Sequence, residues 1–250
     1  FAEKRRVYMA LLDTYVGIDT AHLAQADYRR ALDLAGQLKA RGLVDLLMGT
    51  ISPSTTTRRD DLRVDENDSA MEMAAQVSRK LERWTKAAPD PVGLTAPVRL
   101  PDEVIGAVGE ETAIVEYLLA ERRSYVWVLT DAGLQMRRLA GREEIQPRVE
   151  AFLKLASRPS LSRVQWSELR RLAERLYVDL IGPIEDVIVD REHLVVAPDD
   201  RLYHLPFEAL AAPTRDEAID WLVEEHSVSY VPSSKVFALL RRHQIGRAHV

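Results

Sequence analysis

The chain contains no cysteine among its 250 residues, which excludes disulfides, cysteine-ligated metals and a thiolate nucleophile within it. The motifs GxSxG, GxGxxG and GxxxxGK[ST] are also missing, so neither a nucleophile elbow nor a glycine-rich phosphate loop is present. None of the six histidines pairs with another at the i, i+4 spacing with an intervening glutamate that a helical zinc-protease site uses. We therefore expect no metal, no cofactor and no catalytic residue in these 250 positions.

Charge and hydropathy exclude two further classes of function. The 34 basic and 39 acidic residues give a formal net charge of -5, and no segment concentrates lysine and arginine as a nucleic-acid-binding surface requires. The apolar runs are much shorter than the roughly 20 residues of a membrane-spanning helix, and no signal-peptide pattern is present. We expect a cytoplasmic protein that binds neither nucleic acid nor membranes.

The first hundred residues have a helical pattern with interruptions. Residues 1–50 place apolar side chains at i, i+3, i+4 and i+7 in two stretches, which predicts an antiparallel helical hairpin. Residues 51–65 are rich in serine, threonine and charge, and this composition is typical of a linker. Residues 66–96 should form a connecting helix followed by a proline-rich crossing in extended form.

The pattern changes to that of an α/β domain further along the chain. Residues 112–139 hold three β-branched and aromatic runs, which predict an antiparallel meander whose middle strand is covered on both faces. Two amphipathic helices follow, the second ended by Gly182-Pro183, and then a strand at 193–197. The order strand, helices, strand predicts a right-handed crossover within an α/β fold. A last strand, in HSVSYVP, leads to Ser233 and Ser234, which should cap a terminal helix.

Residues 194–210, LVVAPDDRLYHLPFEAL, place a buried strand, an acidic turn and a Pro-Phe corner in immediate succession. With GEETAIVEYLLAERRSYVWVLT before it and LVEEHSVSYVPSSKVFALLRR after it, this segment resembles the CHAT domain, a caspase- and separase-like module usually fused to tetratricopeptide repeats in bacteria. The run ALDLAGQLKARGLVDLL resembles the helix that ends the repeat array in such proteins. The resemblance implies a tetratricopeptide remnant at 1–50 and an incomplete caspase-like α/β sandwich, including the meander, at 97–243.

The resemblance also implies a function for the complete protein, which is cysteine endopeptidase activity on a protein or peptide substrate. The catalytic histidine of the family follows a later strand of His-Gly type and the cysteine follows a still later strand, so neither maps onto any residue here. We expect the chain itself to be an inert fragment. Two alternatives stay open: a non-catalytic scaffold or pseudo-protease whose repeats bind protein partners, and a self-contained small α/β binding domain.

The end of the sequence carries a separate expectation. Residues 244–250, QIGRAHV, match the translation of a widely used sequencing adapter, which predicts a non-native tail. The alternative is a natural helix end with Gly246 as its cap.

Candidate site residues gather around the acidic turn. His204 lies close enough to Asp199 and Asp200 for a carboxylate to orient it as a general base, but the sequence around it offers no nucleophile, and we expect a strand-edge histidine with a local hydrogen bond. The possible cleft rim comprises Asp199, Asp200, His204, Pro206 and Phe207. An acidic rim would favour basic substrate side chains, whereas the alternative is that the two aspartates only close a hairpin. If further strands of the sheet are encoded after this segment, the sheet of this chain is incomplete. It should then present an unpaired strand edge.

Overall fold

The computed structural model describes residues 28, 29, 31–33, 35, 36, 39, 105, 108–214 and 218–238. The chain divides into two compact units, 1–99 and 100–250, and the described residues of the first unit are helical. Most of the expected hairpin at 1–50, the linker at 51–65, the connecting helix and crossing at 66–96 and the tail at 244–250 lie outside the described residues. The tetratricopeptide origin of the first unit therefore stays a prediction.

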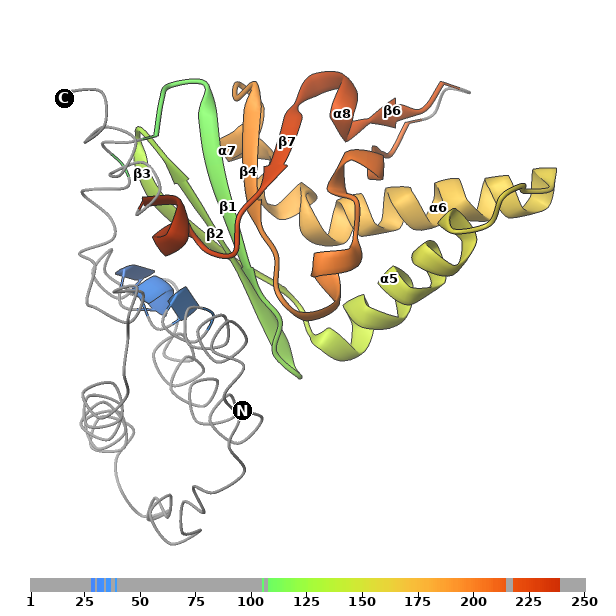
Figure 1. The fold of residues 1–250 in the computed structure, drawn as a ribbon, viewed down its shortest axis with the longest axis horizontal. Helices are drawn as coiled ribbons and strands as arrows, with labels where there is room; N and C mark the ends of the chain where they lie inside the picture. The colour runs from blue at the N-terminus through green and yellow to red at the C-terminus, as the bar shows by residue number, and fades with distance from the viewer. Residues whose placement is uncertain are drawn as a thin grey trace, which may run out of the picture. The chain divides into compact units, whose positions relative to one another are not determined.

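The second unit is built on a mixed five-stranded sheet with the strand order β3-β2-β1-β4-β7 (Figure 1). Its strands are β1 (Thr112–Leu118), β2 (Arg123–Thr130), β3 (Gly133–Ala140), β4 (His193–Ala197) and β7 (Ser227–Tyr230). The first three form an antiparallel meander, whereas β4 runs parallel to both β1 and β7. The predicted meander and the α/β class are confirmed.

Two long helices cover one face of this sheet (Figure 1). They are α5 (Arg142–Ala156) and α6 (Arg163–Leu180). Ser162 caps α6 by accepting a hydrogen bond from the Gln165 amide, and the Gln165 side chain accepts one from the Ser162 amide in return, a capping box that fixes the start of the helix. The predicted end at Gly182-Pro183 is confirmed, because these residues begin the short 3-10 turn η2 (Gly182–Ile184).

Shorter elements complete the described part of the second unit. They are α7 (Glu185–Ile188), η3 (Asp200–His204), η4 (Phe207–Ala209), β5 (Ala211–Ala212), β6 (Asp220–Trp221) and α8 (Leu222–Glu225). The small strands β5 and β6 pair antiparallel in a separate two-stranded sheet. A helical turn at 234–238 follows β7 and lies on the side of the large sheet away from α5 and α6 (Figure 1).

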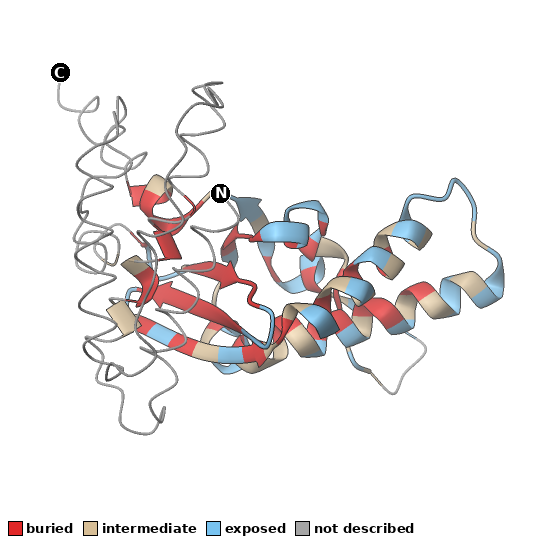
Figure 2. Ribbon diagram, turned by 90° about the horizontal axis from the view of Figure 1, so that it is seen from below, coloured by how far each residue is buried: buried red, intermediate tan, exposed pale blue. Residues whose placement is uncertain are grey.

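The central strands are buried on both faces (Figure 2). On the helix side, Val115 and Tyr117 join one apolar cluster with side chains of α5 and α6. On the other side, Ile114, Trp127 and Leu129 are 0% exposed. Because successive side chains of a strand point to opposite faces, this pattern confirms that the middle of the sheet is covered on both sides.

Gly141 joins β3 to α5 at a point where no side chain fits. A Cβ atom on Gly141 would lie 2.4 Å from the Glu121 carbonyl oxygen and 2.8 Å from that of Arg122. Both are main-chain atoms of the turn between β1 and β2, and the Arg142 amide binds the same turn through the Ala120 carbonyl at 2.7 Å. The start of α5 is therefore packed tightly against the turn between β1 and β2.

Replacing Gly141 by alanine should lower the free energy of unfolding by about 1–3 kcal/mol, the usual cost of overpacking against atoms that cannot move aside. Gly109→Ala is the matched control, because a Cβ atom at Gly109 meets nothing within 4 Å, and its effect should stay within about 0.5 kcal/mol. Urea denaturation followed by tryptophan fluorescence measures both changes. Equal stability of the two variants would contradict the close approach at Gly141.

Candidate functional site

The corner after β4, residues 198–210, lies at the carboxyl edge of the three parallel strands. The register pairs Glu116 of β1 with Ala197 of β4, and Val196 of β4 with Tyr230 of β7. The chain therefore leaves all three strands at the same edge of the sheet. In α/β folds, binding and catalytic groups gather at this edge because loops from several strands converge there. We take the corner as the candidate functional site.

Two aspartates fix the beginning of the corner. Asp199 is buried, and its Oδ2 accepts a hydrogen bond from the Leu119 amide at 2.8 Å. Asp200 adopts a left-handed backbone conformation with φ 50°, and its carboxylate lies 3.2 Å from Nε of Arg142. Arg142 in turn donates to the Leu119 carbonyl at 2.9 Å. The corner is thus tied to the end of β1 and to the start of α5.

The alternative that these aspartates close a hairpin is wrong. β4 pairs with β1 and β7 in parallel, and Asp200 begins η3 instead of a return strand. An antiparallel partner is needed for a two-residue hairpin, whereas parallel partners require a longer connection.

Aromatic packing fixes the other end of the corner. The buried ring of Phe207 lies with its centroid 5.3 Å from that of Tyr117 and 6.4 Å from that of Tyr230. The Tyr230 hydroxyl donates to Glu208 Oε2 at 2.6 Å and accepts from the Phe207 amide at 2.9 Å. Burial and then the Glu208 hydrogen bond raise the pKa of Tyr230 above its ordinary value, so the phenol stays protonated and acts as a structural donor.

The other predicted rim residues are more accessible. His204 is exposed at the end of η3. Pro206 lines an apolar pocket of about 520 Å³ together with Phe152, Leu161, Trp166, Leu169, Ala209 and Trp221. Of the predicted rim residues, Pro206 thus lines a pocket, whereas Asp199 and Phe207 are buried in the core. Asp200 forms an ion pair with Arg142. A rim role in substrate binding stays a prediction for all five residues.

The two other described histidines lie at the opposite edge of the sheet. His226 is buried, with Nδ1 2.6 Å from the Arg191 carbonyl. His193 is exposed, with Nδ1 2.5 Å from Ser227 Oγ. The Ser227 hydroxyl also lies 3.2 Å from the Glu192 carbonyl oxygen, to which it can donate. His22, His243 and His249 lie outside the described residues.

Sequence reasoning missed Glu116, a fully buried carboxylate in the middle of β1. Its Oε2 accepts hydrogen bonds from the Ser234 amide at 2.9 Å and the Ser234 hydroxyl at 2.5 Å. Ser233 caps the turn at 234–238 by accepting from the Val236 amide at 3.3 Å, as predicted. The available signal was one acidic residue inside the otherwise apolar run AIVEYLLA, because a buried charge needs partners.

The comparisons with known proteins identify part of the second unit. The family model of the CHAT domain matches residues 170–250, a range that includes most of α6, β4, the corner and β7. No curated protein matches the chain. None of the helices that the structure describes has the length and apolar character needed to cross a membrane. The CHAT resemblance is therefore confirmed for residues 170–250.

Replacing Asp199 by alanine should lower the free energy of unfolding by about 1–3 kcal/mol, because the buried Leu119 amide would lose its acceptor. Asp200→Asn is the matched control. Asparagine tolerates the left-handed conformation, and the partly exposed pair with Arg142 contributes at most about 1 kcal/mol. Chemical denaturation measures the free energy of unfolding of both variants. A larger loss of stability for Asp200→Asn than for Asp199→Ala would contradict this account of the corner.

Proposed function

We propose that this chain, whose residues 170–250 match the CHAT-domain family model, is part of a caspase-like cysteine endopeptidase that acts on proteins or peptides. In this proposal the second unit supplies the first strands of the catalytic domain, and the first unit belongs to a repeat array that binds a protein partner or substrate. The observation that carries the proposal is the position of the family match. It covers the corner, β4 and β7, whose carboxyl ends lie beside that of β1.

The chemistry of such an enzyme explains why the corner is held so firmly. A cysteine reacts as its thiolate, and a neighbouring imidazole has to form that thiolate and deliver the proton afterwards. Catalysis requires both groups to keep their geometry, and this is achieved when they project from a rigid sheet with well-packed neighbours. The ties of the corner to Leu119, Arg142 and Tyr230 provide rigidity at this edge.

The chain has no cysteine, so it is inert in this proposal, and the histidine and cysteine follow strands encoded later in the same reading frame. One feature of the sheet is consistent with additional strands. β7 is an edge strand among the described residues. The amides of Ser227 and Val231 donate to the carbonyls of Glu192, directly before β4, and of Val196 within it. By the alternation of a parallel ladder, the amides of Val228 and Tyr230 therefore point to the open side.

Extending the protein along its reading frame tests the catalytic proposal. The longer protein should be alkylated by iodoacetamide at one cysteine much faster than a free cysteine peptide, because the adjacent imidazole increases the thiolate fraction. Changing the histidine of the His-Gly strand end to alanine should remove this acceleration and the cleavage of a peptide library. The cysteine-free 250-residue chain gives the background.

A reading frame without these two residues, or a cysteine whose reactivity does not depend on the histidine, would contradict the enzyme. It would favour the alternative of a non-catalytic scaffold or pseudo-protease. The apolar pocket beside the half-exposed Trp166 is the type of surface that such a scaffold could use.

Hydrogen exchange at β7 tests the proposed continuation of the sheet. In the 250-residue chain, the amides of Val228 and Tyr230 should exchange rapidly, while the Ser229 amide, which the ladder directs to β4, should be protected. In the extended protein, all three amides should be protected, because a further strand pairs with the open edge. Fast exchange at Val228 and Tyr230 in both proteins would contradict pairing at this edge, whatever the outcome of the alkylation experiment.

A further inference from the structure

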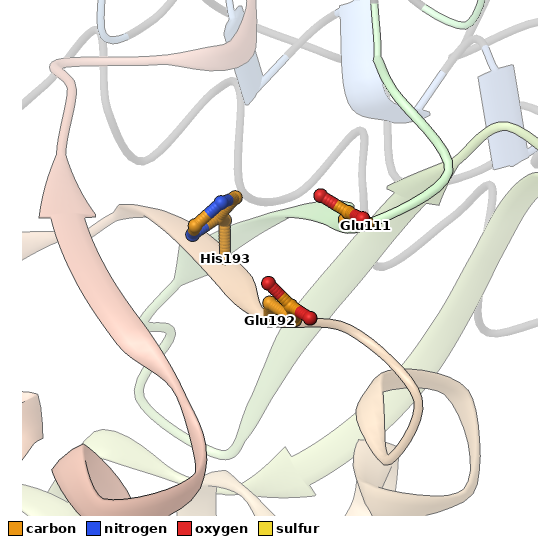
Figure 3. Close-up of side chains that lie close together, drawn as sticks. All are labelled: Glu111, Glu192 and His193. Atoms are coloured by element: carbon orange, nitrogen blue, oxygen red, sulfur yellow. The ribbon is translucent and has the colours of Figure 1, made fainter.

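Three potential metal ligands meet at the amino edge of β1 and β4 (Figure 3). Glu111 directly precedes β1, Glu192 directly precedes β4, and His193 is the first residue of β4. The register places Thr112 beside His193, and the His193 amide donates to the Glu111 carbonyl at 2.9 Å. One ligand atom from each of the three side chains lies within 4.8 Å of the other two, and all three residues are exposed. The sheet itself therefore fixes their proximity.

One ring nitrogen of His193 is held by a hydrogen-bonding neighbour. Nδ1 of His193 lies 2.5 Å from Ser227 Oγ, and the same hydroxyl lies 3.2 Å from the Glu192 carbonyl oxygen. In the tautomer with its proton on Nδ1, the ring donates to Ser227 and Nε2 keeps a lone pair for a metal. Metal-binding histidines are commonly oriented by such a hydrogen bond from the second ring nitrogen.

The charges nearby do not neutralise the two glutamates. Arg191, adjacent to Glu192, is engaged by Asp131 Oδ1 at 2.6 Å and donates to the Glu110 carbonyl. Among the described residues, neither Glu111 nor Glu192 forms an ion pair. Two carboxylates at this separation repel each other, and a divalent cation between them would convert the repulsion into attraction.

We propose that Glu111, Glu192 and His193 bind a divalent transition-metal ion of the Zn²⁺ type. An imidazole with two carboxylates suits zinc and similar borderline ions, whereas Mg²⁺ and Ca²⁺ prefer oxygen ligands alone. Zinc-ligand bonds of about 2.0–2.2 Å place ligand atoms roughly 3.5 Å apart. The exposed side chains have to close by about 1 Å, which rotamer changes allow. Water completes the coordination.

The bound ion would join the first residues of β1 and β4 across the sheet. Since metal that binds only the folded protein stabilises it, this site acts as a clamp on the parallel pair. It lies at the edge opposite to the corner, so it does not depend on the proposed peptidase activity.

Isothermal titration of the 250-residue chain with ZnCl₂ tests the proposal. The substitutions Glu111→Gln, Glu192→Gln and His193→Ala should each weaken Zn²⁺ binding at least about tenfold, because each removes one of three ligands. Ser227→Ala should weaken it by about tenfold through loss of the ring orientation. Three exposed residues outside the cluster supply matched controls: Glu110 and Asp190 lie near it in sequence, and His204 lies at the opposite edge of the sheet. The substitutions Glu110→Gln, Asp190→Asn and His204→Ala should each change the affinity by less than about twofold.

Circular dichroism of every variant checks that the fold is retained. We expect it to be, because the substituted side chains are exposed. The thermal midpoint of the unsubstituted chain should rise with Zn²⁺, and that of His193→Ala should not. The proposal is overturned if the unsubstituted chain binds Zn²⁺ no more tightly than about 1 mM, if the ligand variants bind like the controls, or if MgCl₂ binds as tightly as ZnCl₂.

Discussion

The second unit depends on one constraint, which is that β1 is covered on both faces and its polar groups have to find partners inside the protein. A buried polar group without a hydrogen-bond partner lowers the stability of the fold by several kcal/mol. The partners of β1 therefore have to lie within hydrogen-bonding distance of it. The Tyr117 hydroxyl donates to the Leu180 carbonyl at 3.0 Å, which ties β1 to the end of α6, and burial raises the pKa of this phenol far above its ordinary value. Glu116 binds Ser234 on the opposite face, and the Leu119 amide binds Asp199.

These three ties explain the arrangement of elements that are far apart in the sequence. The end of α6, the corner after β4 and the turn at 234–238 are each attached to a different residue within the last half of β1 or immediately after it. The first residues of β1 pair with β4, and the exposed Glu111 and Glu192 lie directly before these two strands. The two edges of the parallel strands therefore differ in physical character. Near the carboxyl edge, Glu116, Tyr117 and the Leu119 amide are buried with partners, whereas the amino edge carries the exposed side chains of Glu111 and Glu192.

The elements that the sequence predicted correctly are those with a local signal. Alternation marks the meander, the Gly182-Pro183 pair marks the end of α6, and serine at 233 marks a cap. The hairpin alternative at Asp199 and Asp200 failed because an acidic turn has the same local sequence whether the next strand returns antiparallel or crosses over. Only the pairing of β4 with β1 and β7 distinguishes these cases, and strand pairing is a long-range property.

The same reasoning accounts for what was missed at each edge. Glu192 and His193 are neighbours in sequence, but Glu111 is separated from them by the whole of the meander and both long helices. A search for short-range ligand motifs excludes helical zinc sites and says nothing about ligands on adjacent parallel strands. Once β4 is known to pair with β1 in register Thr112 to His193, the residues before each strand have to converge. Polar residues directly before two neighbouring parallel strands therefore indicate a shared site only after the strand order is known. The same condition applies to the residues that follow such strands at the corner.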